Sequence, residues 1–154
     1  GSFKNSSASQ RGFGKENKKN TTLMHWKYNK KPDLSQFGFV YCITNIKTGK
    51  AYIGCKQYYN YKKNKKQSES NWKSYMGSSK YLLEDIKKIG KKNFRFEVIA
   101  ELKNKRSLRY YECYYQMKFN VLTATLEGTD EAAFYNNYVG GKFYRPVQNY
   151  VDSC

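Results

Sequence analysis

The sequence has no long apolar run and few acidic residues. No stretch of about 18 consecutive apolar residues occurs in its 154 positions, so a membrane-spanning helix is not predicted. The N-terminus also shows no apolar segment between a basic start and a cleavage site, which argues against a secretion signal. We therefore expect a soluble protein that stays in the cytoplasm.

Cysteine and histidine are scarce as well. The chain has one histidine, His25, and four cysteines without a C-x-x-C pair, which are Cys42, Cys55, Cys113 and Cys154. A structural zinc site is not predicted from these residues, and free thiols are expected in a reducing compartment. A two-residue turn at Thr48-Gly49 would place Cys42 opposite Cys55, which leaves a cross-strand disulfide as the alternative.

Positive charge is what the sequence has in excess. It carries 29 Lys and Arg against 12 Asp and Glu, a formal net charge of +17 and a pI near 9.7. Such a charge is typical of proteins whose partner carries many phosphates, above all nucleic acid. An A·T-rich genome would also favour Lys, Asn and Tyr, so the charge alone leaves both interpretations open. A membrane surface is not favoured, because no long helix gathers the basic residues on one face.

The chain divides into a polar N-terminal segment and one domain. Residues 1–36 are rich in Ser, Asn, Gly and Lys, which predicts a basic flexible arm, and residues 1–2 are typical of a cloning remnant. Residues 37–154 are enough for a single domain. Met24, Trp26 and Tyr28 interrupt the arm's polar composition and would either hold its end against the domain or contact a partner.

Alternating residues predict three strands. Residues 39–54 alternate and are interrupted by Lys47-Thr48-Gly49-Lys50, which indicates a β-hairpin. Residues 94–102 alternate in the same way and indicate a third strand. The segment 56–74 combines lysines with aromatic residues and has no apolar stripe, so it is predicted to be a connection outside the core.

Two helices complete the predicted fold. One extends over residues 79–89, with Ser79 as its N-cap and Gly90 as its stop. The other extends over residues 105–119, and its predicted apolar face consists of Leu108, Tyr111, Tyr115 and Phe119. The order of elements predicts a small α/β fold of the α+β type, with a three-stranded antiparallel sheet flanked by helices.

The predicted hairpin carries a family resemblance. Phe39-Val40-Tyr41 and Tyr52-Ile53-Gly54 resemble the two motifs of the GIY-YIG nuclease family, with the motif tyrosines 11 positions apart. Phe39 stands where the family has a glycine. The strings 72–80 and 86–94 resemble those of free-standing phage endonucleases of the homing type, and the similarity spans residues 39–119.

The resemblance implies a GIY-YIG-like domain and a metal-dependent DNA endonuclease that hydrolyses phosphodiester bonds. A nicking, homing-type phage enzyme is the finer version of this prediction, and it would act in the cytoplasm of the host cell. The alternative is a non-cleaving nucleic-acid-binding protein built on a degenerate domain of the same family. Double-stranded DNA is the expected partner, while the oligomeric state is left open.

The resemblance also implies catalytic residues. Tyr41 and Tyr52 would contact and deprotonate the attacking water, which requires a nearby cation because the ordinary pKa of a phenol is about 10. Glu112 would hold one Mg²⁺ or Mn²⁺ ion, since a hard cation can take its other ligands from water and phosphate oxygens. Packing is the alternative role of the tyrosines. Glu112 could instead be a surface residue paired with Lys105, Arg109 or Gln116.

The family's arginine and asparagine each have more than one candidate counterpart in this sequence. Lys62 stands at the arginine position but lacks the bidentate guanidinium, so Lys56 and then Arg109 follow as candidate catalytic cations. Asn137 resembles the family's late asparagine, which orders the site through hydrogen bonds. Asn136 is an equally allowed alignment, and a turn asparagine is the alternative.

Residues for DNA binding are predicted around the helix that begins near Ser79. The N-terminus of that helix offers N–H groups to a phosphate. Trp72 and Tyr75 would stack on an exposed base or cap the core. The predicted DNA-contacting residues are Lys56, Lys62, Lys63, Trp72, Lys73, Tyr75, Ser79 and Lys80.

Overall fold

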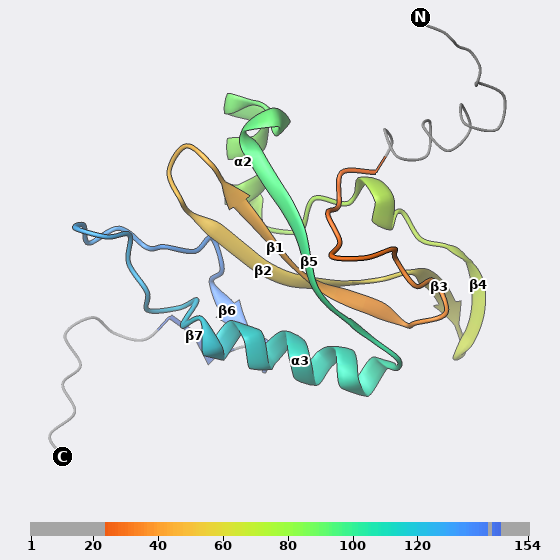
Figure 1. Ribbon diagram of the computed structural model, residues 1–154. Coiled ribbons are helices and arrows are strands. Elements are labelled where there is room, and N and C mark those ends of the chain that lie inside the picture. Colours follow the sequence, from red (N-terminus) through yellow and green to blue (C-terminus); the bar gives the residue numbers. More distant parts are fainter. Residues whose placement is uncertain (1–23, 142, 146–154) are drawn as a thin grey trace, which may run out of the picture.

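The central element is an antiparallel sheet of three strands. A computed structural model describes residues 24–141 and 143–145 of the chain (Figure 1). Strands β1 (Gly38–Asn45), β2 (Ala51–Gln57) and β5 (Phe94–Leu102) are ordered β2-β1-β5, with β1 antiparallel to both neighbours. The predicted fold class is confirmed.

The register of the first hairpin differs from the two-residue turn considered above. Asn45 accepts hydrogen bonds on Oδ1 from the backbone N–H groups of Lys47 (3.0 Å) and Thr48 (3.3 Å), which closes a longer loop before β2. Cys42 consequently pairs with Ile53, and Cys55 lies two residues further along β2. Both cysteines are free thiols, so the alternative of a cross-strand disulfide is wrong.

Both faces of β1 are buried, in two separate clusters. Phe39, Tyr41 and Ile43 face a cluster that includes Leu82 and Ile86 of α2 (Lys80–Ile89). Val40, from the opposite face, packs with Leu108 of α3 (Lys105–Lys118) and with Val121 and Leu122 beyond that helix. The sheet is therefore covered by different helices on its two faces, as Figure 1 shows.

Both predicted helices are confirmed, together with the two caps predicted for the first. Ser79 Oγ accepts a hydrogen bond from the Leu82 N–H (3.3 Å), and Gly90 ends α2 with a φ of +99° that favours glycine. Asn104 Oδ1 accepts from the Ser107 N–H (2.8 Å) at the start of α3. A short 3₁₀ turn, η2 (Lys91–Asn93), connects α2 to β5.

The buried face of α3 differs from the predicted one. Leu108 and Gln116 are buried, and Glu112 lies half-buried between them on the same face. Tyr111 and Phe119, which were predicted to face the core, are 39% and 43% exposed. Residues 108, 112 and 116 lie on one face because they are four residues apart. This face was not predicted to be buried, because Glu112 and Gln116 are polar and make polar contacts there instead of apolar packing.

Residues 56–74 were predicted to be a connection outside the core, and this prediction holds for the exposed residues 60–69 but is wrong for Tyr58 and Trp72. They form the hairpin β3 (Tyr59–Lys62) and β4 (Lys65–Glu69), followed by the 3₁₀ turn η1 (Trp72–Ser74). Tyr58 and Trp72 flank the hairpin and are fully buried in the cluster on the α2 face of the sheet. Two aromatic residues so far apart leave no periodic signal in the sequence.

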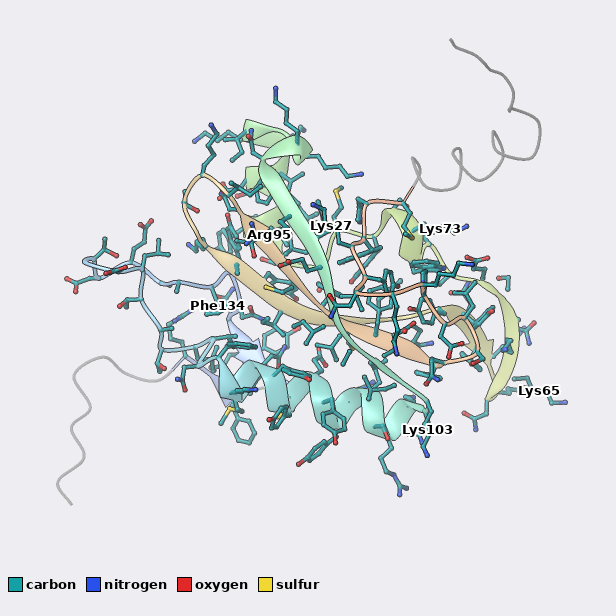
Figure 2. The ribbon with its side chains drawn as sticks, in the orientation of Figure 1. Lys27, Lys65, Lys73, Arg95, Lys103 and Phe134 are labelled. Carbon is teal, nitrogen blue, oxygen red and sulfur yellow. The ribbon has the colours of Figure 1, made fainter. Side chains whose placement is uncertain are left out.

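The segment before β1 packs on the sheet. Lys27 (Figure 2) donates its N–H to the Phe96 carbonyl (2.9 Å) and accepts from the Val98 N–H (3.0 Å), which adds a short parallel bridge to β5. Trp26 is 3% exposed, and its indole N–H donates to the Trp72 carbonyl (2.6 Å). Of the two uses predicted for the aromatic residues here, the structure shows packing against the domain. The predicted boundary at residue 36 stays a prediction, and residues 1–23 of the predicted arm lie outside the described residues.

The C-terminal part of the described chain returns to the sheet. Ala51 donates its N–H to the Ala133 carbonyl (2.9 Å), and Tyr135 donates to the Ala51 carbonyl (2.7 Å). The small strands β6 (Tyr138–Val139) and β7 (Phe143–Tyr144) then pair with each other beside α3 (Figure 1). None of the helices in the described ranges combines the length and the apolar character needed to cross a membrane.

Candidate active site

A cavity of about 360 Å³ lies where β1 and β2, the start of α2, α3 and residues 135–140 meet. It gathers most residues that were predicted for catalysis, although they come from distant parts of the sequence. The predicted catalytic residues that line it are Tyr41, Tyr52, Arg109, Glu112 and Asn137.

The two motif tyrosines stand side by side on the hairpin. Their ring centroids are 6.2 Å apart, and Tyr41 is only 1% exposed. Gly54 is paired with Tyr41 in the register, and a Cβ atom at this position would lie 2.5 Å from the Tyr41 hydroxyl oxygen. Glycine at position 54 therefore makes room for that hydroxyl. The Tyr52 hydroxyl lies 3.4 Å from Ser78 Oγ at the edge of the cavity.

Burial keeps both phenols protonated. It raises the pKa of Tyr41 well above its ordinary value, and neighbouring tyrosines and Glu112 act in the same direction. Burial also raises the pKa of Tyr52 to about 12, which the contact with Ser78 partly offsets. The nearby cation that a tyrosine base requires is not among the groups that shift either pKa.

Glu112 is the carboxylate of the cavity. Burial raises its pKa, whereas a hydrogen bond with the Cys55 thiol and the positive charge of Arg109 lower it. Two ion pairs occur among the described residues, Lys73 with Glu69 and Arg95 with Glu97 (Arg95 is labelled in Figure 2), and neither involves Glu112. Glu112 therefore lines the cavity without an ion-pair partner among the described residues.

The donor set suits a hard divalent cation better than zinc. The described residues contain no group of three or more His, Cys, Asp and Glu side chains placed to hold a metal. One half-buried carboxylate, surrounded by phenol and amide oxygens, is the arrangement expected when water and substrate phosphate complete the shell of Mg²⁺ or Mn²⁺. The residues present thus fit the predicted single metal ion.

Three basic residues were predicted to replace the family's arginine, and they lie at different distances from the cavity. Arg109 lines it together with Glu112. Lys56 Nζ lies 4.2 Å from the centroid of the Tyr75 ring, in an adjoining cavity of about 340 Å³. Lys62 is exposed on β3 and lines neither cavity, because the β3–β4 hairpin carries it away from β2. Arg109 thus lies in the cavity, Lys56 beside it and Lys62 outside both, while the choice of the residue that replaces the arginine stays a prediction.

Asn136 and Gln116 hold the backbone of one hairpin residue, Ile53. Asn136 is 2% exposed, accepts from the Ile53 N–H (3.1 Å) and donates to the Ile53 carbonyl (2.8 Å). Gln116 donates to the same carbonyl (3.0 Å) and accepts from the Gly140 N–H (3.1 Å). Asn137 is exposed and lines the cavity. The ordering hydrogen bonds predicted for Asn137 thus belong to Asn136, its alternative.

Gln116 was missed by sequence analysis. The available signal was its position four residues after Glu112, which places both on one helix face. A polar residue on the core side of a helix needs a partner, and the Ile53 carbonyl is that partner.

The predicted DNA-contacting residues are divided between three places. Tyr75, Ser79 and Lys80 line the cavity, and Lys56 lies beside it. Lys62 and Lys63 belong to the exposed β3–β4 hairpin. Lys73 (Figure 2) pairs with Glu69 at 3.9 Å. Trp72 is 1% exposed, so its ring caps the core and is not available to stack on a base.

The fold and the cavity define a nuclease domain of the GIY-YIG type. Residues 15–139 match the family model described as "Putative endonuclease segE, GIY-YIG domain". Because this match covers well over half of the chain, the protein belongs to the GIY-YIG nuclease family. Nucleases of this family act on nucleic acid and generally use a divalent metal. No curated protein and no solved structure gave a significant match to the chain.

Proposed function

We propose that the protein is a metal-dependent endonuclease that hydrolyses phosphodiester bonds in double-stranded DNA in the cytoplasm. The observation that carries the proposal is the position of Glu112, a half-buried carboxylate that faces Tyr41 and Tyr52 across one cavity. A carboxylate for a hard cation and hydroxyls for a water molecule are what hydrolysis of a phosphodiester requires.

Glu112 would hold one Mg²⁺ or Mn²⁺ ion, which when bound stabilises charge on the phosphate and on the departing oxygen. Arg109 lies one helical turn before Glu112 and would contact a non-bridging phosphate oxygen through its planar guanidinium. Tyr52, the more exposed of the two tyrosines, would orient the attacking water through its hydroxyl. Tyr41 supports it from the buried side of the cavity.

Further contacts with DNA are proposed around the mouth of the cavity. The N-terminus of α2 presents backbone N–H groups beside Lys80, a setting that favours a phosphate. Tyr75 lines the cavity and offers a ring face to a base, while Lys56 neutralises a neighbouring phosphate. A single compact cavity acts on one strand at a time, so nicking by a homing-type phage enzyme is the proposed finer activity.

Two observations favour a second candidate function. Burial raises the pKa values of Tyr41 and Tyr52, and no arginine stands at position 62, so the domain has features of a binding protein that no longer cleaves. Such a protein would bind DNA in a salt-dependent manner and leave it intact.

A plasmid assay with a matched variant pair tests the proposal. We expect the wild-type protein to relax or linearise supercoiled DNA in Mg²⁺ or Mn²⁺ and EDTA to prevent this. Glu112→Gln should reduce the rate by at least about 10²-fold, because the amide cannot supply the ligand charge. Glu84→Gln, on the exposed face of α2, is the control and should cleave normally. Binding without cleavage by the wild type would establish the second candidate, and cleavage by Glu112→Gln would refute the metal-ligand assignment.

A further inference from the structure

The β3–β4 hairpin stands apart from the rest of the fold. Its two strands form a sheet of their own, and every residue of β4 is exposed. In Figure 1 the hairpin lies at the end of the molecule away from α2, and Figure 2 shows Lys65 at the outer limit of that end. The hairpin therefore contributes little to the packing of the domain, and a role outside the core has to be sought for it.

The tip of the hairpin concentrates positive charge on both of its faces. Lys62 pairs with Lys65 and Tyr61 with Lys66, so the first pair points to one face and Lys66 to the other. Lys63 occupies the turn between the strands. No acidic residue occurs from residue 59 to residue 68.

This arrangement is unfavourable for the isolated hairpin. Like charges directly opposite each other on paired strands repel. Lys63 and Asn64 have φ values of +51° and +65°, and a lysine in this left-handed region costs about 1 kcal/mol. Neither the paired lysines nor the left-handed turn contributes to packing of the core. Both features bring lysines together at the tip, where a polyanion would neutralise their charge.

The base of the hairpin is fixed to the domain. Ser70 Oγ donates to the Gln57 carbonyl (2.6 Å), and the Trp72 indole N–H donates to a Glu69 carboxylate oxygen (2.7 Å). The rings of Phe37 and Tyr61 are stacked with centroids 5.2 Å apart. The lysines are therefore held in a defined position relative to the candidate active site.

A chain of cavities joins the hairpin to Glu112. The adjoining cavity shares Arg109 and Glu112 with the active-site cavity, and extends along α3 to Lys105. A third cavity, of about 390 Å³, shares Lys105 with the second and ends at Lys63. Lys105 and Glu112 are seven residues apart on α3, about 10 Å, which equals roughly three steps of 3.4 Å along a DNA strand. Basic residues thus line the whole path from the tip of the hairpin to the carboxylate.

We propose that the β3–β4 hairpin inserts into the major groove of duplex DNA a few base pairs from the cleaved phosphate. Lys105 and Arg109 would then contact the cleaved strand between the hairpin and Glu112. The major groove is about 12 Å wide and admits a two-stranded ribbon, and its two phosphate walls match charge on both faces of the hairpin. A single strand would need charge on one face only. The inference rests on the proposed function, because it takes duplex DNA as the substrate.

Two variants that remove the same number of positive charges test the inference. Their affinity for DNA is measured in EDTA, because cleavage does not occur without the metal. Lys62, Lys63, Lys65 and Lys66 are all changed to Gln in the test variant. The control changes the exposed Lys87, Lys88, Lys91 and Lys92 at the α2 end to Gln. We expect the test variant to lose about 2 to 4 units of the slope of log affinity against log salt, and about 10²-fold in affinity for a short duplex near 0.15 M salt. The control should keep the wild-type slope.

Methylation of guanine N7 by dimethyl sulfate reports the major groove directly, because N7 lies there. The wild type and the control should protect guanines to one side of the cleaved phosphate, and the test variant should not. Circular dichroism and thermal melting show whether each variant is folded. Equal slopes for a folded test variant, unchanged N7 protection, or an equal loss of binding to single strands would overturn the inference. Failure of the wild type to cleave, with N7 protection present, would refute the proposed nuclease function and leave the hairpin assignment standing.

Discussion

At the scale of single residues, two neighbouring asparagines occupy different environments. Asn136 is buried and bonded to both backbone polar groups of Ile53, whereas Asn137 is exposed. We predict that Asn136→Ala lowers the free energy of unfolding by about 1 to 3 kcal/mol, because it removes a partner from a buried peptide. Asn137→Ala should change stability by less than about 0.5 kcal/mol. Urea denaturation measures both, and equal effects would contradict the assignment.

His25 gives the protein a pH-dependent stability. Burial lowers its pKa from 6.5 to about 4, its Nε2 contacts the Tyr75 carbonyl (2.8 Å), and its buried Nδ1 has no partner among the described residues. The unfolded chain therefore binds a proton that the folded chain rejects. This contribution to stability is complete above pH 6.5 and is lost as the pH falls toward 4, about 2 to 3 kcal/mol in all.

The expected result is a free energy of unfolding that decreases from pH 6.5 to pH 5, measured by denaturant titration at several pH values. The variant His25→Phe keeps the stacking on Phe96 but does not titrate. It should be insensitive to pH over this interval, where most carboxylates are already ionised. A slope equal to that of the wild type would assign the effect to another group.

Sequence analysis found the site residues that a regular pattern fixes. Tyr41, Tyr52 and Glu112 were located by the resemblance of the hairpin and of the later helix to the family, and the structure brings all three to one cavity. Asn136 and Asn137 differ by one position in an irregular segment, where no period tells which side chain points inward. The position of Lys62 depended on the path of residues 56–74, and long-range packing sets that path.

At the scale of elements, the first hairpin depends on one glycine. A Cβ atom at position 54 would lie 2.5 Å from the Tyr41 hydroxyl oxygen and 3.0 Å from Tyr52 Cε2. We predict that Gly54→Ala displaces both rings and reduces cleavage by at least about 10²-fold. DNA binding should be kept, because none of the basic residues proposed to contact DNA is changed. Plasmid cleavage and anisotropy on one preparation test this, and full activity would show that the tyrosines need not be held so closely.

The elements also show where periodicity fails as a guide. The strands 94–102 and 39–54 and both helices were predicted from alternation, helical spacing and caps, and the structure confirms them. The buried face of α3 was predicted in part wrongly, because Glu112 and Gln116 occupy positions that an apolar stripe would fill. The β3–β4 hairpin was missed because it has no buried face of its own, and alternation cannot mark a strand exposed on both sides.

At the scale of the whole molecule, the segment before β1 contributes to the core. Trp26 contacts the Tyr41 and Phe96 rings and donates to the Trp72 carbonyl. We predict that Trp26→Ala lowers the free energy of unfolding by about 3 to 5 kcal/mol through the cavity that it leaves. Tyr81→Ala, at a site 55% exposed, is the control and should have little effect. A thermal melt of each variant decides, and a small change for Trp26→Ala would show that the segment only lies on the surface.

The amides that hold the Ile53 backbone are synthesised long after the hairpin that they hold. The ribosome makes the tyrosine hairpin first, Gln116 emerges 63 residues after Ile53, and Asn136 emerges 83 residues after it. We expect an unfinished copy that stops before residue 135 to carry both tyrosines and the carboxylate yet leave a plasmid uncut, which the assay above would reveal. A cell that carries such a nuclease would then be spared damage by incomplete chains, because activity arrives only with the last part of the described fold.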